Sequence, residues 1–364
     1  MQLDWLELQS FRSYPHLEFR PDPGTNLLVG ENGAGKTNLL EAIGYLSVLR
    51  SFRKAPDDAL ISTDASEGVV RAAVTGPVSE HTVEVLLSRD SRRKVLLDGK
   101  RPARNSDVRE RLRVVTFLPD DLELVKGSAG RRRDLLDDVS AQLRPAAAAD
   151  QSEFERALRQ RNALLRSDGP FANVDALGSF EAAIAASGAR VVHHRLQTAQ
   201  ALSPFLQAAY QRLAPDTVRW DYVSTWADPD ADAEALAGRL AEALAASRRH
   251  DMERRLTTTG PQRDQPGLML DDRDSRTHAS QGEQRSLVLA LRLAAFDLLS
   301  DAFDDPPILL LDDVFSELDP ARAEAVVSRL PRAQAFLSSA RRNDVGSISG
   351  VYWQVDPAGK VVPG

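Results

Sequence analysis

The stretch GENGAGKT at residues 30–37 constrains the fold more than any other part of this sequence. It matches the pattern G-x-x-x-x-G-K-[ST], follows the apolar run NLLV, and precedes a segment with helical spacing of apolar residues from about Thr37 to Leu49. Glycines let such a loop curl so that backbone N–H groups point at phosphate oxygens. Lys36 would reach the β and γ phosphates, and Thr37 would place its hydroxyl on Mg²⁺. A structural glycine turn is the alternative, and the strand-loop-helix context disfavours it.

A second apolar run, ILLL at residues 308–311, leads directly into the carboxylates of Asp312 and Asp313. Coming just after two prolines, it predicts a strand buried on both faces, as in a parallel sheet covered by helices. Carboxylates at the carboxyl end of such a strand lie where open α/β sheets bind ligands. Unpaired, they would repel one another, so a bound cation and a polar substrate are expected. We expect Asp312 to hold Mg²⁺ through its water shell and Asp313 to orient an attacking water.

A Ser-x-Gly turn at residues 280–282 stands immediately before a long predicted helix, Gln281 to Leu299. This helix N-terminus would be a second place ready to meet an anion. One chain cannot readily wrap both N-termini around the same γ phosphate, so a second copy of the chain is the economical way to bring Ser280 onto a nucleotide. The alternative is an ordinary N-cap at Ser280 with Glu283 completing a capping box, and both can hold together.

Composition bounds the class of protein. The chain has 364 residues, 42% hydrophobic and 27% charged, which are ordinary values for a soluble globular protein. It contains no Cys, which removes disulfides and cysteine-ligated metal sites. No apolar run approaches the roughly 20 residues of a membrane span, and the N-terminus lacks the features of a signal peptide. We therefore expect a soluble, cytosolic protein with no membrane association.

The pattern of residue types along the chain predicts one α/β unit that is split by a helical insertion. Residues 1–120 are mainly strand-like and residues 256–364 return to an α/β pattern, whereas residues 121–255 are rich in Ala, Leu, Arg and Glu. Within that insertion, apolar or Thr residues recur every seven positions from Ile184 to Phe205, which hints at a helical hairpin or short coiled arm. A compact helical subdomain with ordinary amphipathic packing is the favoured alternative.

Positive charge is unevenly placed although the net charge is −7. Basic side chains gather between residues 89 and 113, where Arg92 and Arg93 lie, and at the run that contains Arg131 and Arg132. They are candidate contacts to a phosphate backbone, because Lys and Arg carry most of the affinity for DNA. Solvated sheet edges and a helix cap are the alternative for any single residue, and nothing indicates base-specific readout.

The three motifs, in this order and with SELD at residues 316–319 after the last, resemble those of the ABC-type ATPases. More narrowly they resemble the head domains of the SMC and Rad50 group, and most narrowly the RecF family of bacterial recombination mediators. Seven blocks spread over nearly the whole chain carry this resemblance, namely LQSFRSYPHLEF, GENGAGKTNLLEAI, LRSFRKAPDDALI, FLPDDLELVKGSAGRRRDLLD, TTGPQRD, SQGEQRSLVLALRLA and LLLDDVFSELD. The length is close to that of a bare head with no long coiled coil.

The resemblance implies an ABC-type P-loop ATPase head with a β-rich subdomain and a helical insertion domain. It also implies a protein that binds ATP and Mg²⁺, forms an ATP-dependent homodimer, and binds duplex DNA next to single-stranded gaps. RecO, RecR and RecA are the implied partners, with RecA placed on the gap.

Site residues follow from the same resemblance. Lys36 and Asp313 would serve catalysis, Thr37 and Asp312 would hold Mg²⁺, and Ser280, Gly282 and Glu283 would reach the nucleotide of the partner subunit. Arg12 in FRSY resembles a nucleotide-side contact, while Arg53 and Lys54 in SFRK resemble the arginine loop through which related heads sense DNA. The remaining nucleotide contacts would come from Gly30, Glu31, Asn32, Gly33, Ala34, Gly35 and Asn38.

Two departures from the ABC pattern predict slow turnover. The usual Glu after the apolar strand is Asp313 here, one methylene shorter, so water alignment should be looser. The switch His expected after the strand QAFL is replaced by Ser338 and Ser339. We expect slow ATP hydrolysis that acts as a timer, so that the nucleotide state controls the lifetime of a dimer on DNA. The main alternative is a repair ATPase head of the same superfamily that acts with other partners. A transporter ATPase would need a glutamine loop and a switch His.

Overall fold

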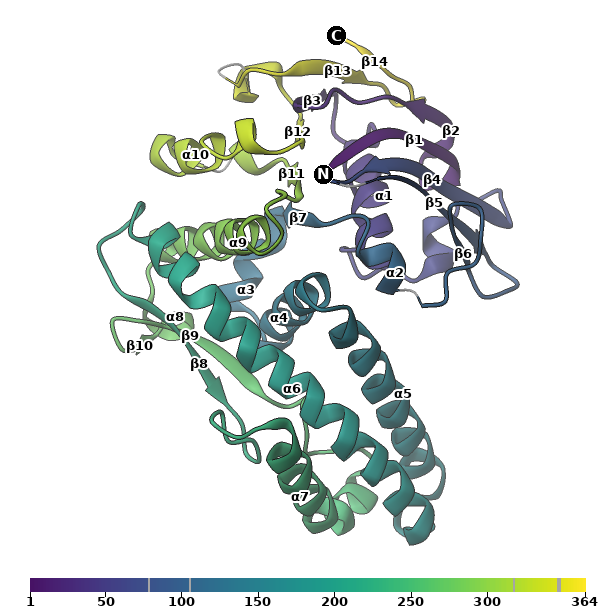
Figure 1. Ribbon diagram of the computed structural model, residues 1–364, viewed down its shortest axis with the longest axis vertical. Coiled ribbons are helices and arrows are strands. Elements are labelled where there is room, and N and C mark those ends of the chain that lie inside the picture. The colour runs from purple at the N-terminus through teal and green to yellow at the C-terminus, as the bar shows by residue number, and fades with distance from the viewer. Residues whose placement is uncertain (78, 105, 317, 346–347) are drawn as a thin grey trace. The chain divides into compact units, whose positions relative to one another are not determined.

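The computed structural model describes residues 1–77, 79–104, 106–316, 318–345 and 348–364. The chain divides into two compact units, the first formed by residues 1–121 with 289–364 and the second by residues 122–288 (Figure 1). The second unit extends past the boundary expected at residue 255, because the strands after that point pair with a strand inside the insertion. Among the described helices, none is both long and apolar enough to cross a membrane.

A five-stranded antiparallel sheet forms the first part of unit 1, in the order β2-β1-β4-β5-β6 (Figure 1). Alternate residues of these strands are buried, as in a sheet that covers a core on one face. A hairpin turn is present at Asp98 and Gly99, with positive φ at both residues. The strands span Gln2–Phe11 (β1), Tyr14–Phe19 (β2), Glu67–Thr75 (β4), Glu80–Ser88 (β5) and Lys94–Leu97 (β6).

A six-stranded sheet forms the second part of unit 1, in the order β14-β13-β3-β12-β11-β7. All its pairs are parallel except β13 with β14, which form an antiparallel hairpin that closes the chain. Strand β11 is buried along its whole length, so the prediction from ILLL is confirmed. The strands span Thr25–Val29 (β3), Val114–Phe117 (β7), Ile308–Asp312 (β11), Ala335–Ser339 (β12), Val351–Val355 (β13) and Val361–Pro363 (β14).

Helix α1, Lys36–Val48, joins the two sheets of unit 1 into one hydrophobic core. Its Leu39, Leu40, Ile43 and Leu46 are fully buried, as their helical spacing predicted. The other helices that contribute to this unit are α2 (Ser106–Arg109), α10 (Pro320–Val327) and the C-terminal part of α9 (Gln281–Phe303).

Unit 2 is a helical bundle with a small antiparallel sheet. Helix α6 (Val174–Tyr210) is one continuous helix through Gly188 and Pro204, and it packs on both α5 and α7. The bundle core includes Ile184 and Val191, so the seven-residue spacing reflects packing within a compact subdomain. The remaining helices are α3 (Glu123–Lys126), α4 (Ala129–Leu143), α5 (Pro145–Asp168), α7 (Ala233–Arg254) and α8 (Ser275–His278), and the sheet order is β10 (Arg273–Asp274), β9 (Gln265–Leu270), β8 (Val218–Val223).

Candidate nucleotide site

The glycine loop lies between β3 and α1, where the sequence predicted it. Gly33 and Gly35 have φ of +85° and +106°, a region that favours glycine. A Cβ on Gly30 would lie 2.2 Å from the carbonyl oxygen of Val355, so the loop begins against β13. A Cβ on Gly35 would lie 2.9 Å from the hydroxyl oxygen of Ser13. These glycines are therefore required by backbone conformation or by close approach, and the loop is a curled turn between strand and helix.

Lys36 is buried at the first turn of α1 and is held by the loop itself. Its Nζ donates to the carbonyl oxygens of Gly30 at 2.6 Å and Glu31 at 2.9 Å. Burial lowers the pKa of Lys36, and the nearby carboxylates of Asp313 and Asp312 act in the opposite direction. The ammonium group thus lies under the loop and within the field of the two carboxylates that end β11.

Thr37 and Asp312 are brought together from positions far apart in the chain. The Thr37 Oγ1 lies 2.9 Å from each carboxylate oxygen of Asp312, and the Ser338 hydroxyl donates to Asp312 Oδ1 at 2.6 Å. The sheet order β3-β12-β11 explains the arrangement, because Asp312 and Ser338 are register partners on adjacent parallel strands. A hydroxyl and a carboxylate, both hard oxygen donors, are the set that Mg²⁺ prefers. The residues present therefore fit a magnesium ion.

Asp313 turns out of the strand that carries Asp312. Its φ is +50°, and its N–H lies 3.2 Å from the carbonyl oxygen and 3.0 Å from the hydroxyl oxygen of Ser338. Asp is among the residues that tolerate this left-handed conformation. Consecutive side chains on a strand point to opposite faces. The backbone turn at Asp313 breaks this alternation for the two carboxylates. Ser338 was noted in the sequence only as a replacement for a His, and its contacts to both aspartates could not be read without the strand register.

Arg12 is placed beside the glycine loop, but its donors are engaged within the protein. It occupies the tight turn between β1 and β2 with φ of +53°. Its Nε and Nη2 donate to the two carboxylate oxygens of Glu41 at 2.9 Å, and Nη1 donates to the Ala59 carbonyl oxygen at 2.9 Å. The next residue, Ser13, accepts a hydrogen bond from Asn38 Nδ2 at 2.9 Å. The expected nucleotide contact by Arg12 would require its guanidinium to change partners.

The Ser280 turn lies in unit 2 and has the geometry of a capping box. The Ser280 N–H donates to Glu283 Oε2 at 2.6 Å, and the Glu283 N–H donates to the Ser280 hydroxyl oxygen at 3.3 Å. The pKa of Glu283 is lowered by hydrogen bonds to its carboxylate, first from the Ser280 hydroxyl and then from the Ser280 N–H. Gly282 lies between them at the start of α9. Glu317 of the SELD stretch lies outside the described residues.

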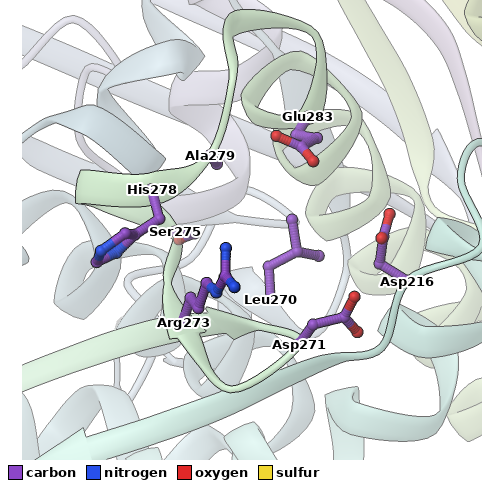
Figure 2. A pocket seen from close by; sticks show the side chains of 8 residues that line it. All are labelled: Asp216, Leu270, Asp271, Arg273, Ser275, His278, Ala279 and Glu283. Carbon is purple, nitrogen blue, oxygen red and sulfur yellow. The ribbon is translucent and has the colours of Figure 1, made fainter.

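A pocket of about 300 Å³ adjoins the Ser280 turn within unit 2. Figure 2 shows the side chains of Asp216 and Asp271 on one side of it and that of His278 on the other. Its three carboxylates, Asp216, Asp271 and Glu283, face one guanidinium, that of Arg273. This charge balance does not favour a phosphate inside the pocket.

The six basic residues predicted to face DNA separate into two groups. Arg53, Lys54 and Arg92 are exposed, and Arg131 is half-buried. Arg93 donates to the Leu49 carbonyl oxygen at 2.5 Å and pairs with Asp57 at 3.1 Å. Its guanidinium is thus engaged within the fold.

Arg132 does not fit the predicted DNA contact. It is 5% exposed and donates to the carbonyl oxygens of Pro266, Leu124 and Gly127. A guanidinium buried in this way ties α3, α4 and β9 together, so we correct its assignment to a structural one. The sequence could not separate Arg132 from Arg131, because helix phase alone decides which of them is buried.

Comparison with known proteins decides the family. Residues 2–352 match the RecF/RecN/SMC N terminal domain. The DNA replication and repair protein RecF of Streptomyces avermitilis is 37% identical over 366 residues, covering 98% of each chain. The protein of the same name from Acidothermus cellulolyticus is 40% identical over 348 residues, covering 93% of each chain. The chain belongs to the RecF family.

Solved structures agree with this assignment. The structure of the recombination mediator protein RecF-ATPrS in the RecFOR pathway has a TM-score of 0.91 at 26% identity and covers 99% of this chain and 97% of that one. An Smc head bound to the C-winged helix domain of ScpA has a TM-score of 0.55 at 18% identity, which shows the fold alone. The predicted ABC-type ATPase head is confirmed, and membership of the RecF family makes the chain a protein of DNA replication and repair.

Proposed function

We propose that this RecF family member binds ATP with Mg²⁺ at the loop of residues 30–37 and works as an ATP-dependent clamp on DNA. The observation that carries the proposal is the meeting of Thr37 with Asp312 at 2.9 Å beneath the glycine loop. Residues separated by most of the chain converge there with the chemistry that triphosphate binding needs. The related RecF structure with ATPrS supports the same ligand class.

The loop residues would act mainly by binding and orienting the phosphates. Lys36 would exchange its two carbonyl partners for β and γ phosphate oxygens. Thr37 and Asp312 would hold Mg²⁺, which when bound supplies positive charge against the phosphates. Backbone N–H groups from Gly33 to Thr37 would complete the cradle at the N-terminus of α1.

Asp313 would position the attacking water and receive its proton. Its short side chain and turned backbone support loose alignment and slow hydrolysis, as expected for a timer rather than a motor. Steady-state hydrolysis measures this directly, and a turnover number like those of transport ATPases would contradict the timer. Lys36→Arg should slow hydrolysis by about 100-fold while retaining part of the nucleotide and DNA binding.

A second copy of the chain would complete the site with Ser280, Gly282 and Glu283. The Ser280 hydroxyl stands at the exposed N-terminus of the long helix α9, where an anion is favoured. Binding of two nucleotides between two copies would then make dimer lifetime depend on ATP. DNA held by the dimer would be duplex beside a single-stranded gap, with RecO and RecR as partners in placing RecA.

Sedimentation velocity tests this clamp. The protein is compared with and without Mg²⁺ and a slowly hydrolysed ATP analogue, and with and without a short gapped duplex. We expect a monomer that becomes a dimer when the nucleotide is present, and Ser280→Arg should abolish that shift by placing bulk at the dimer seam. If the wild-type protein stays monomeric under all conditions and still hydrolyses ATP, the Ser280 turn serves only as a helix cap.

A further inference from the structure

Glu41 is a fully buried carboxylate one helical turn after Thr37 on α1. It receives the fork of Arg12 through Nε and Nη2, both at 2.9 Å, and it also accepts the hydroxyl of Ser51. A two-pronged guanidinium pair with a further hydroxyl donor satisfies this charge away from water. Neither the glycine loop of residues 30–37, called the phosphate loop from here on, nor the hydrophobic core requires a charge at this position. The partners of Glu41 therefore indicate its role.

The first partner, Arg12, belongs to the turn that rests on the phosphate loop. The two residues after it contact the loop and the start of α1, because the Tyr14 hydroxyl donates to the Gly35 carbonyl oxygen at 3.0 Å and Ser13 accepts from Asn38. The Arg12 backbone N–H also donates to the Leu60 carbonyl oxygen at 2.7 Å. The turn is therefore tied by hydrogen bonds to the loop and to the first turn of α1.

The second partner, Ser51, organises an exposed basic turn. Its hydroxyl oxygen accepts the N–H of Arg53 at 3.0 Å, and its carbonyl oxygen accepts the N–H of Lys54 at 3.0 Å. Ser51 is buried, whereas the side chains of Arg53 and Lys54 are exposed. The guanidinium of Arg53 lies 3.5 Å from Asn38 Oδ1, over the start of α1. Through Ser51, Glu41 thus anchors the turn that presents the side chains of Arg53 and Lys54 to solvent.

We propose that Glu41 is a positioning residue that couples the phosphate loop to the basic turn of Arg53 and Lys54. Through Arg12 and Ser51 it makes the placement of these cations depend on the state of the loop. Nucleotide at the loop and a DNA phosphate at the turn then strengthen each other's binding by the same factor, as linkage requires. This inference rests on the proposed function, since it assumes that the chain binds both ligands.

The test measures that factor. The affinity for a short fluorescent gapped duplex is measured by anisotropy with and without ATPγS and Mg²⁺, and the ratio of the two values is the coupling. We expect about fivefold or more for the wild type, and less than about twofold for Glu41→Gln, which keeps the shape but removes the charge. With nucleotide present, the slope of log Kd against log salt should fall by about one, because a phosphate contact is lost.

Two controls separate positioning from loss of folding. Glu84→Gln removes a matched carboxylate that accepts Arg71 Nε at 2.6 Å on the five-stranded sheet, and it should keep the wild-type coupling. Ser51→Ala removes only the hydroxyl that joins the basic turn to Glu41, so it carries the test if Glu41→Gln does not fold. ATPγS binding without DNA should stay within about threefold of wild type in both Glu41→Gln and Ser51→Ala.

The outcomes are distinct. Wild-type coupling in folded Glu41→Gln, or in Ser51→Ala, would overturn the role of Glu41 while leaving the proposed function in place. A wild-type protein that binds neither ATPγS nor DNA would instead remove the proposed function itself. Reduced coupling in both variants, with Glu84→Gln unchanged, supports the inference.

Discussion

The phosphate loop in unit 1 and the Ser280 turn in unit 2 are both helix N-termini, yet they are built in opposite ways. The loop is anchored by contacts between distant residues, such as Thr37 with Asp312 and Gly30 against Val355. The Ser280 turn is exposed and complete within four residues through the capping box with Glu283. The proposed phosphate site thus depends on several strands of the sheet, whereas the Ser280 turn is complete within its own helix.

The comparison is tested most strongly at Asp312. Asp312→Asn keeps the shape of the side chain but removes its charge, so hydrolysis should fall by about 100-fold or more. Ser338→Ala removes only the hydroxyl that orients Asp312 and should cost about tenfold. Steady-state phosphate release measures both. An Asp312→Asn protein that hydrolyses ATP like the wild type would show that the long-range contacts are structural.

The second test uses two substitutions at Ser280. Ser280→Asp keeps an N-cap acceptor, so stability to urea should change by less than about 0.5 kcal/mol, whereas Ser280→Ala should cost about 1 kcal/mol. Ser280→Asp also places a negative charge where a phosphate would bind, so nucleotide-dependent dimerisation should weaken about tenfold or more. Sedimentation with ATPγS checks this. Unchanged dimerisation of Ser280→Asp would leave the turn with a capping role only.

A third test contrasts exposed and buried cations. Arg53→Ala with Lys54→Ala should reduce the salt slope of DNA binding by about two and the affinity by about tenfold at low salt. Arg132→Ala should instead leave the slope unchanged and destabilise the fold by about 2 kcal/mol, because it strands buried carbonyl oxygens. Anisotropy titrations over a salt series, with urea unfolding alongside, separate the two. A loss of slope in Arg132→Ala would restore it as a DNA contact.

The smallest effect is the pH dependence of the capping box. The pKa of Glu283 lies below its usual value of 4.5, so the folded state binds fewer protons than the unfolded state at this group. Its stabilisation is therefore present above pH 4.5 and is lost as pH falls through the lower folded pKa. Calorimetry should find Glu283→Gln less stable than wild type by at most about 3 °C at pH 7. That difference should vanish towards pH 3, and a constant difference would argue against the ionised capping box.

The elements that sequence predicted well are those with a strong local pattern. The apolar runs before Gly30 and Asp312 gave the central parallel strands, and helical spacing gave α1 and most of α9. Strand β8 was missed, because VRWDYV lies in a helix-rich segment and pairs with β9, more than 40 positions along the chain. The roles of Ser338 and Glu41 depend on strand register and on turns from three segments, which no local pattern encodes.

Strand β3 leads into the phosphate loop, and both of its neighbours in the sheet come from the last thirty residues of the chain, β12 at Ala335–Ser339 and β13 at Val351–Val355. Residue Gly30 itself rests against Val355. During synthesis the GENGAGKT stretch therefore leaves the ribosome long before the two strands that flank β3 in the sheet. A nascent chain cannot close the sheet around β3 until β12 and β13 have emerged, so the loop at Gly30 gains its last supporting contacts late in synthesis.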